Sequence, residues 1–324
     1  MGLLVKGKWQ DRWYDTDSTD GEFVRSDAQF RDTISNDSDA KFPAQAGRYH
    51  LFVSLACPWA HRTLIFRALK GLEEVISVSI VAPEMLDQGW VLSDEGGAHP
   101  VKDITHLHQV YTTAQPDFSG RVTVPVLWDK QTQSIVNNES AEIIRILNSA
   151  FNEFTPDPSD YYPAALQGEI DKINEYVYDA INNGVYKAGF ATTQRAYETH
   201  VDKLFTALDN IELRLTNQRY LCGEQITEAD WRLFTTLIRF DSVYFGHFKT
   251  NLRQIESYPN LSNYVRDLYQ RPGVAQTVDF RHIKVHYYYS HDMINPTRVV
   301  PAGPMIDYHS AHNRGQLPDG KGGA

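Results

Sequence analysis

A cysteine placed directly before a proline is the first feature of this sequence that could do chemistry. Cys57 and Pro58 lie between an apolar stretch, "GRYHLFVSLA", and a stretch with apolar residues at helical spacing, "PWAHRTLIFRALKGLE". Proline is favoured at the first position of a helix because its missing N–H needs no partner there, so Cys57 falls at or beside the N-cap. Free amides and the positive dipole end of the helix stabilise a thiolate at that position. The pattern therefore predicts a nucleophilic cysteine.

The surroundings of Cys57 favour a single sulfur acting alone. Ala60 stands where a dithiol enzyme has its second cysteine, and the other cysteine, Cys222, lies in "RYLCGEQIT" without a comparable setting. A lone thiolate forms a mixed disulfide with a small thiol and is released by a second one, and glutathione is the obvious candidate. A lone cysteine can also be a buried apolar filler, and we assign that structural role to Cys222.

Two further segments could hold a peptide-like thiol beside Cys57. In "TVPV", Pro125 is predicted to be cis at the entry to a strand, which lets the backbone of Val124 bind the ligand. Proline in an edge strand is the alternative explanation. In "NNES", Glu139 and Ser140 open a predicted helix whose amides and hydroxyl can hold a γ-glutamyl carboxylate, while Glu139 meets the ammonium group. An acidic residue and a serine at a helix start can also be simple caps.

The elements that must position these residues fall into an α/β pattern. Residues 1–45 lack a sustained period and predict an irregular N-terminal arm. Residues 46–155 read as β-α-β followed by β-β-α, which is the order of a thioredoxin-like domain. The prolines and aspartates of "TPDPSDYYP" then predict a linker.

The second half of the chain has a different period. Residues 164–288 show helical spacing almost throughout and predict an all-α domain. Within this domain Thr227 and Asp230 are spaced as a capping box at the start of a helix, which stabilises the domain rather than touching substrate. Residues 289–324 leave this period and form a C-terminal extension and tail, and we expect its Gly-rich tip to be disordered.

Composition and charge limit the classes of partner. The formal charge is -10 and Lys and Arg form no cluster, so no nucleic-acid partner is expected. No apolar run is long enough to span a bilayer and the N-terminus is too polar for a signal peptide, so we expect a cytoplasmic protein without a membrane partner. His99, His106 and His108 lack the Cys or carboxylate spacing of a metal site, so we expect a solvated loop and no metal.

The sequence resembles the glutathionyl-hydroquinone reductases, the xi class of the glutathione transferases, over roughly residues 40–305. The resemblance is carried by long motifs: "SLACPWAHRTLI", "GWVLSDE", "RVTVPVLWDKQTQSIVNNESAEIIRILN", "GVYKAGFATTQ", "RFDSVYFGHFKTN" and "HYYYSHDMINPTRVVPAGP". It implies a thioredoxin-like domain followed by a glutathione-transferase-type helical domain, and a homodimer. The implied partners are glutathione and glutathionylated hydroquinones. In the implied reaction Cys57 attacks the glutathionyl sulfur, the hydroquinone leaves, and a second glutathione releases oxidised glutathione.

The resemblance also implies the residues of a glutathione site. A tryptophan could cover the flank of the ligand, and Arg121 could pair with its glycyl carboxylate. Leu92 departs from the family pattern, in which an aromatic residue is expected after "GW", and this puts the packing beside Trp90 in doubt. The implied glutathione contacts are Trp90, Arg121, Val124, Pro125, Glu139 and Ser140.

Tyrosines complete the implied site. Departure of the hydroquinone needs a proton donor beside its ring, and the thiolate needs hydrogen bonds that hold its charge. The family motifs place the donor on Tyr186, with Tyr244 and Tyr287 lowering the pKa of the cysteine. The choice between Tyr287 and Tyr288 stays open.

Two rival functions fit parts of the same pattern. An omega-like thioltransferase or dehydroascorbate reductase shares the fold and the single thiol of Cys57. A non-catalytic interaction module could keep the fold for docking alone, although a docking surface has no need of Cys57, Glu139, Ser140 and the tyrosines together.

Overall fold

The computed structural model describes residues 2–93 and 97–317, and the chain divides into two compact units. The first unit comprises the described parts of Met1–Trp13, Arg25–Ser159 and Gln276–Val300. The second unit comprises Tyr14–Val24, Asp160–Ala275 and the described part of Pro301–Ala324. Each unit therefore takes a piece of the arm and a piece of the C-terminal extension. The prediction of a disordered Gly-rich tip falls on residues 318–324, which lie outside the described residues.

A five-stranded sheet forms the centre of the first unit. Its order is β5-β4-β3-β7-β8, where β3 and β4 are parallel and the other neighbouring pairs are antiparallel. Leu51 of β3 pairs with Val78 of β4 on one side and with Leu127 of β7 on the other. The bounds are β3 Tyr49–Val53, β4 Ser77–Leu86, β5 Gly89–Leu92, β7 Val126–Asp129 and β8 Ser134–Asn137. All five residues of β3 are buried, as expected for a central strand.

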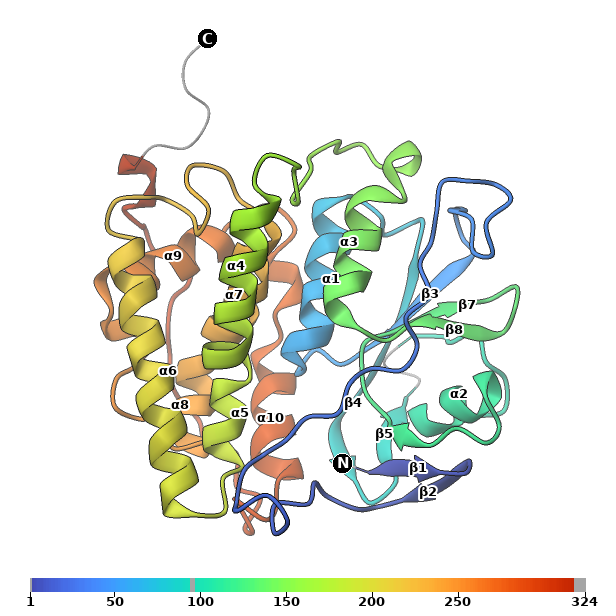
Figure 1. Cartoon of the computed structure of the whole chain (residues 1–324), viewed down its shortest axis with the longest axis horizontal. Helices are drawn as coiled ribbons and strands as arrows, with labels where there is room; N and C mark the ends of the chain where they lie inside the picture. The colour runs from blue at the N-terminus through green and yellow to red at the C-terminus, as the bar shows by residue number, and fades with distance from the viewer. Residues whose placement is uncertain (1, 94–96, 318–324) are drawn as a thin grey trace. The chain divides into compact units, whose positions relative to one another are not determined.

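Helices complete the predicted order of the first unit. Helix α1, Pro58–Leu69, connects β3 to β4, and α3, Ser140–Ser149, follows β8. The two helices pack side by side (Figure 1). This order, β3-α1-β4 and then β7-β8-α3, confirms the predicted thioredoxin-like domain. The polar insertion between β5 and β7 contains a helix of its own, α2, Leu107–Ala114.

The start of the N-terminal arm forms strands of a second, three-stranded sheet. Strands β1, Leu3–Val5, and β2, Lys8–Gln10, form a hairpin, and β1 also pairs with β6, Gly120–Arg121. The prediction of an irregular arm is therefore wrong for these residues. Lys6 and Gly7 both have positive φ, which is typical of a tight hairpin turn, but three-residue strands are too short to show a period in the sequence.

Helix α10, Phe280–Ser290, also belongs to the first unit, although its residues fall in the range predicted as the helical domain. The helix begins at the cap Asp279, whose carboxylate accepts the N–H of His282. It packs on β4, where Ser290 Oγ accepts the N–H of Met85 at 3.0 Å. A long-range contact of this kind cannot be read from helical spacing, which is the same in both units.

The second unit is helical, as predicted, and its described residues include two π-helical turns. These turns, η3 and η4, lie just before α5 and α8. The bounds are α4 Gln167–Val177, η3 Tyr178–Asn182, α5 Gly184–Gly189, α6 Gln194–Arg214, α7 Glu228–Arg239, η4 Phe240–Tyr244, α8 Phe245–His247 and α9 Pro259–Tyr269. The 3-10 turns η5 Ile255–Ser257 and η7 Arg314–Gln316 also lie in this unit, whereas η2 Asn152–Phe154 lies in the first unit and η6 Ala275–Thr277 crosses the boundary between the two in sequence. No helix in the described ranges is long and apolar enough to cross a bilayer.

Helix α7 carries the predicted capping box, and every one of its residues is buried. The carboxylate of Asp230 accepts the N–H of Thr227 at 2.8 Å and the N–H of Leu221 at 2.8 Å. The same carboxylate accepts the hydroxyl of Tyr264 on α9 at 2.7 Å. A buried carboxylate with these partners joins α7, α9 and the preceding loop, so it holds the core of the second unit together.

Candidate active site

Cys57 is the N-cap of α1, as the sequence predicts, and Pro58 is the first helical residue. The backbone of Cys57 is extended, with φ -77° and ψ 122°, and its carbonyl accepts the N–H of His61 at 3.0 Å. Its side chain is half-buried and the sulfur is a free thiol. The positive dipole end of the helix therefore lies beside a sulfur that a ligand can reach.

The backbone of Val124 lies against this sulfur. The Val124–Pro125 peptide bond is cis, as predicted, and the Cys57 Sγ lies 3.7 Å from the carbonyl oxygen of Val124. Residues separated by most of a domain in sequence therefore meet here. The structure brings together three of the predicted site residues, Cys57, Val124 and Pro125.

Glu139 and Ser140 begin α3, also as predicted. Glu139 is the N-cap, and its carboxylate accepts the N–H of Ala141 at 3.0 Å. Ser140 is buried, and its hydroxyl accepts an N–H of Arg62 on α1 at 3.4 Å. The guanidinium of Arg62 lies 4.6 Å from the ring centre of Trp59, so the starts of α1 and α3 are joined by a buried cation. The sequence reasoning missed Arg62, although a charge among the apolar residues of "HRTLIF" was a usable signal.

The asparagines of "NNES" were missed as well. The Asn137 side chain accepts the N–H of Glu139 at 2.7 Å and donates to the carbonyl of Asp32 at 2.9 Å. It also donates to Glu142 at 2.8 Å. These bonds fix the bend between β8 and α3, so they hold the start of α3 in place.

Trp90 and Tyr287 lie on either side of one histidine. Trp90 on β5 stacks on the ring of His286 with ring centres 4.7 Å apart, and His286 meets Tyr287 edge-on at 5.4 Å. Tyr287 is fully buried and also meets His291 edge-on at 5.5 Å, whereas Tyr288 is half-buried. The choice of Tyr287 over Tyr288 stays a prediction.

Arg121 holds the arm. Its two terminal nitrogens donate to the backbone carbonyls of Arg12 and Trp13. Its own backbone pairs with Leu3 of β1. A glycyl carboxylate at Arg121 would therefore compete with these carbonyls or share the guanidinium with them.

Tyr186 and Tyr244 lie together in the second unit, with ring centres 6.0 Å apart. Both are buried, and both contact Phe248, which stacks on Tyr244 at 5.4 Å and meets Tyr186 edge-on at 5.6 Å. Phe23 from the arm also stacks on Tyr186, with ring centres 6.3 Å apart. Tyr244 is the last residue of η4 and Tyr186 follows η3, and π-helical turns are frequent at functional sites. The sequence pattern gave no sign of these turns.

Two of the three histidines that were expected in a solvated loop belong to helix α2 or its cap. His106 is the N-cap of α2, and His108 within α2 stacks between His106 and Trp9 of β2. The expectation of a loop is therefore wrong for His108, which lies in α2 under Trp9, and for His106, which caps α2 and pairs with Val91. Among the residues that the structure describes, no group of three or more His, Cys, Asp or Glu side chains is arranged to hold a metal ion.

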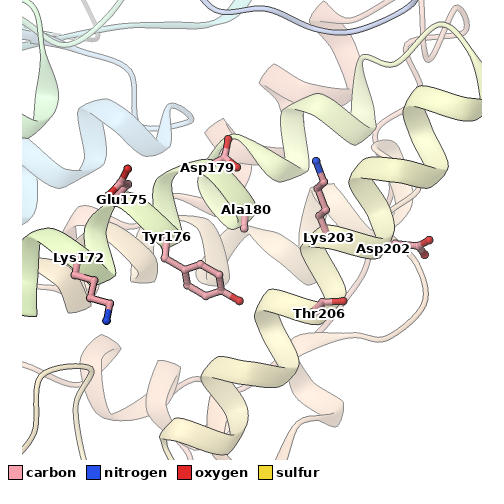
Figure 2. Close-up of a pocket in the computed structure, with 8 residues that line it drawn as sticks. All are labelled: Lys172, Glu175, Tyr176, Asp179, Ala180, Asp202, Lys203 and Thr206. Atoms are coloured by element: carbon pink, nitrogen blue, oxygen red, sulfur yellow. The ribbon is translucent and has the colours of Figure 1, made fainter.

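A separate groove of about 690 Å³ lies in the second unit between α4, η3 and α6 (Figure 2). Its lining carries charges of both signs and contains no predicted site residue. The lining residues are Lys172, Glu175, Tyr176, Asp179, Ala180, Asp202, Lys203 and Thr206. The lining given for this groove contains no cysteine, so the groove is not suited to thiol chemistry.

Two family models match the chain. Residues 56–150 match the glutathione S-transferase N-terminal domain, and residues 194–267 match the glutathione S-transferase C-terminal domain. The first match contains Cys57, Val124 and the start of α3, and the second contains Tyr244. The chain belongs to the glutathione S-transferase family.

Similar proteins narrow this family to one class. The glutathionyl-hydroquinone reductase PcpF of Sphingobium chlorophenolicum is 54% identical over 306 residues, which are 94% of this chain and 96% of PcpF. A xi-class glutathione transferase from Natrialba magadii has a TM-score of 0.91 at 46% identity, covering 98% of each chain. The glutathione-bound structure of YqjG, a glutathione transferase homolog from Escherichia coli K-12, has a TM-score of 0.88 at 48% identity, covering 97% of this chain and 99% of that one. Within the family, the chain groups with the xi class.

Proposed function

We propose that this protein is a glutathionyl-hydroquinone reductase that uses Cys57 as its nucleophile. The observation that carries the proposal is the half-buried thiol of Cys57 at the N-cap of α1, 3.7 Å from the carbonyl of Val124. It occurs in a chain 54% identical to a protein named for this activity. The dipole end of α1 favours the thiolate that the reaction needs.

The proposed reaction has two steps. In the first, the Cys57 thiolate attacks the glutathionyl sulfur, a sulfur–sulfur bond forms, and the carbon–sulfur bond to the ring breaks with its electron pair left on the ring carbon. A proton added to that carbon completes the hydroquinone. In the second step, the thiolate of another glutathione attacks the mixed disulfide, so that oxidised glutathione leaves and the Cys57 thiolate is restored. The hydroquinone carbon is reduced and two glutathione sulfurs are oxidised.

The starts of α1 and α3 supply the proposed glutathione site. The backbone of Val124 beside Pro125 would bind the cysteinyl part of glutathione by main-chain hydrogen bonds. The amides that begin α3, the hydroxyl of Ser140 and the carboxylate of Glu139 would bind the α-carboxylate and ammonium of the γ-glutamyl group. In this assignment the Glu139 carboxylate has two roles: it binds the ammonium of glutathione, and it caps α3 by accepting the N–H of Ala141 at 3.0 Å.

Trp90 and Arg121 would bind the remaining parts of glutathione. The indole of Trp90 would cover the flank of the ligand, held in its orientation by the stacked ring of His286. Arg121 would meet the glycyl carboxylate while its guanidinium keeps the arm in place.

The tyrosines would serve the leaving hydroquinone. A phenol can donate a proton to the ring carbon while its own ring stacks on the substrate. Tyr186 is the proposed donor, and Tyr244 and Tyr287 would hydrogen-bond to the thiolate. The contact of Tyr186 with both Tyr244 and Phe248 supports a fixed position for its ring.

The test is turnover of a purified glutathionyl-hydroquinone with excess glutathione, followed by chromatography of both products. Wild type should release equal amounts of hydroquinone and oxidised glutathione, and Cys57→Ala should release neither. Cys222→Ala is the matched control, because it removes the other thiol, and it should keep the activity. Mixed-disulfide reduction without hydroquinone release would favour the omega-like thioltransferase. Wild type that turns over neither substrate, and so does not differ from Cys57→Ala, would instead favour the non-catalytic module.

Assembly and location are proposed from the family resemblance. We propose a homodimer in the cytoplasm. Light scattering on the purified protein measures the mass directly, and a value matching one chain of 37.0 kDa would contradict the dimer.

A further inference from the structure

The hydroxyl of Tyr111, at the middle of α2, lies at the centre of a buried hydrogen-bond network. It donates to the carbonyl of Thr123 at 2.9 Å and accepts the N–H of Thr123 at 3.3 Å. It also accepts from the side-chain amide of Asn138 at 3.2 Å. The residue is fully buried, so water cannot replace these bonds if the hydroxyl is lost.

The two segments that meet at Tyr111 are those that flank the proposed glutathione site. Thr123 directly precedes Val124, whose carbonyl lies 3.7 Å from the sulfur of Cys57. Asn138 directly precedes Glu139, the cap of α3. One hydroxyl therefore joins the backbone beside the thiol to the start of the helix that would receive the γ-glutamyl group.

The surrounding packing keeps the phenol ring in one place. Phe118 lies 5.2 Å from the Tyr111 ring centre, and Phe30 meets it edge-on at 5.9 Å. Phe30 also pairs with Asn138, whose side-chain oxygen accepts the Phe30 N–H at 3.1 Å. A ring fixed on two sides gives its hydroxyl a defined position, so the network transmits that position to both segments.

We propose that Tyr111 is a positioning residue that fixes the separation between the Val124 backbone and the start of α3, and thereby sets the affinity for glutathione. The inference rests on the proposed function, because it takes these two segments as the glutathione site. Tyr111 does not touch reacting atoms in this account. It acts through Thr123 and Asn138.

The experiment measures glutathione binding by calorimetry in a Cys57→Ser background, which binds the ligand without forming a disulfide. Tyr111→Phe removes one oxygen and leaves the ring. We expect its Kd for glutathione to rise about tenfold, because the two segments lose their common partner. In the protein with Cys57 intact, the KM for glutathione should rise by a similar factor while kcat changes little.

Tyr49→Phe is the matched control. Tyr49 is equally buried in the same unit, and its hydroxyl donates to the carbonyl of Pro43 at 2.7 Å, away from Val124 and Glu139. It should lose stability to a similar degree and keep the wild-type Kd. An unchanged Kd in Tyr111→Phe, or the same rise in both variants, would overturn the inference.

A second variant keeps the test decisive if Tyr111→Phe does not fold. Asn138→Ala cuts the link to α3 and leaves the bonds from Tyr111 to Thr123, and it should also weaken glutathione binding. If both single variants fold, the double variant should bind about as weakly as the weaker single one, because both changes break one connection. Additive losses would contradict a shared role.

Calorimetry also separates this inference from the proposed function. Glutathione binding by the parent protein without hydroquinone release would remove the reductase proposal and leave the Tyr111 test intact. Normal reductase turnover by the parent protein, together with an unchanged Kd for glutathione in Tyr111→Phe, would support the reductase proposal and overturn the inference about Tyr111.

Discussion

The two cysteines of this chain occupy opposite environments. Cys57 caps a helix in the first unit, with a half-buried side chain and the carbonyl of Val124 beside its sulfur. Cys222 in the second unit is 5% exposed, and burial, with the charge of Asp230, raises the pKa of its thiol to about 12. The same functional group is thus placed at the positive end of a helix in one unit and near a buried carboxylate in the other. The difference shows that backbone position and nearby charge give two identical side chains different environments, from which we expect different reactivity.

The largest expected difference is in the rate of alkylation by iodoacetamide. Cys57 should react in the folded protein, whereas Cys222 should react at pH 8 about a thousandfold more slowly than a free cysteine. Cys222 should react more slowly because its pKa is raised. In the folded state it therefore stays an unreactive thiol until the pH approaches 12. Mass spectrometry of the labelled peptides measures both rates. Rapid labelling of Cys222 without denaturant would break the comparison.

A second prediction concerns the carboxylate beside Cys222. Asp230→Ala leaves the N–H groups of Leu221 and Thr227 and the hydroxyl of Tyr264 without their acceptor. We expect a loss of about 3 kcal/mol in the free energy of unfolding, measured with urea. The exposed Asp202 on α6 is the control, and Asp202→Ala should change stability by less than about 0.5 kcal/mol. Equal losses in the two variants would show that the network around Asp230 is unimportant.

A third prediction tests the tyrosine pair of the second unit by disturbing the ring that packs on it. A Cβ at Gly189 would lie 2.2 Å from the ring of Phe248, which packs on Tyr186 and Tyr244. Gly189→Ala should cost about 1–3 kcal/mol in the free energy of unfolding and lower reductase turnover. Gly168→Ala on α4 is the control, since no atom lies within 4 Å of its added Cβ, and it should keep full turnover. Turnover unaffected by Gly189→Ala would argue against a catalytic tyrosine pair.

The smallest expected effect concerns an exposed ion pair on α3 of the first unit. Arg31 of the arm donates to Glu142 on α3. The side chain of Arg31 is 48% exposed and that of Glu142 is 36% exposed. Arg31→Ala should cost about 0.5 kcal/mol in urea unfolding and leave alkylation of Cys57 unchanged. A marked change in the labelling rate would mean that surface charge, as well as the helix start, controls the thiol.

The parts of the fold and site that could be predicted were those written in neighbouring residues. The Cys57–Pro58 pair specifies a helix start, the Thr227–Asp230 spacing specifies a capping box, and both are present. The cis bond at Pro125 was also predicted correctly. The arm strands were not, because Leu3–Val5 owes its strand to pairing with Gly120–Arg121, far away in sequence.

The candidate site shows the same division. The roles of Trp90, Arg121 and the tyrosines came from a family resemblance and stay predictions. Arg62 and Tyr111 were missed because each acts through partners on other elements, Ser140 for Arg62 and Thr123 for Tyr111. Such residues cannot be recognised from hydrophobic periodicity, because a buried tyrosine and a buried apolar residue occupy the same positions in the pattern.

The sequence by itself determined the order of elements and the class of fold, and it predicted the nucleophile, because helix starts, caps and strand patterns depend on residues within a few positions of one another. The tertiary structure alone decided which segments meet at the sulfur, that α10 packs on β4, and that Tyr111 joins Thr123 to Asn138. These contacts close long loops, and their stability comes from burying surfaces that no local pattern pairs with each other.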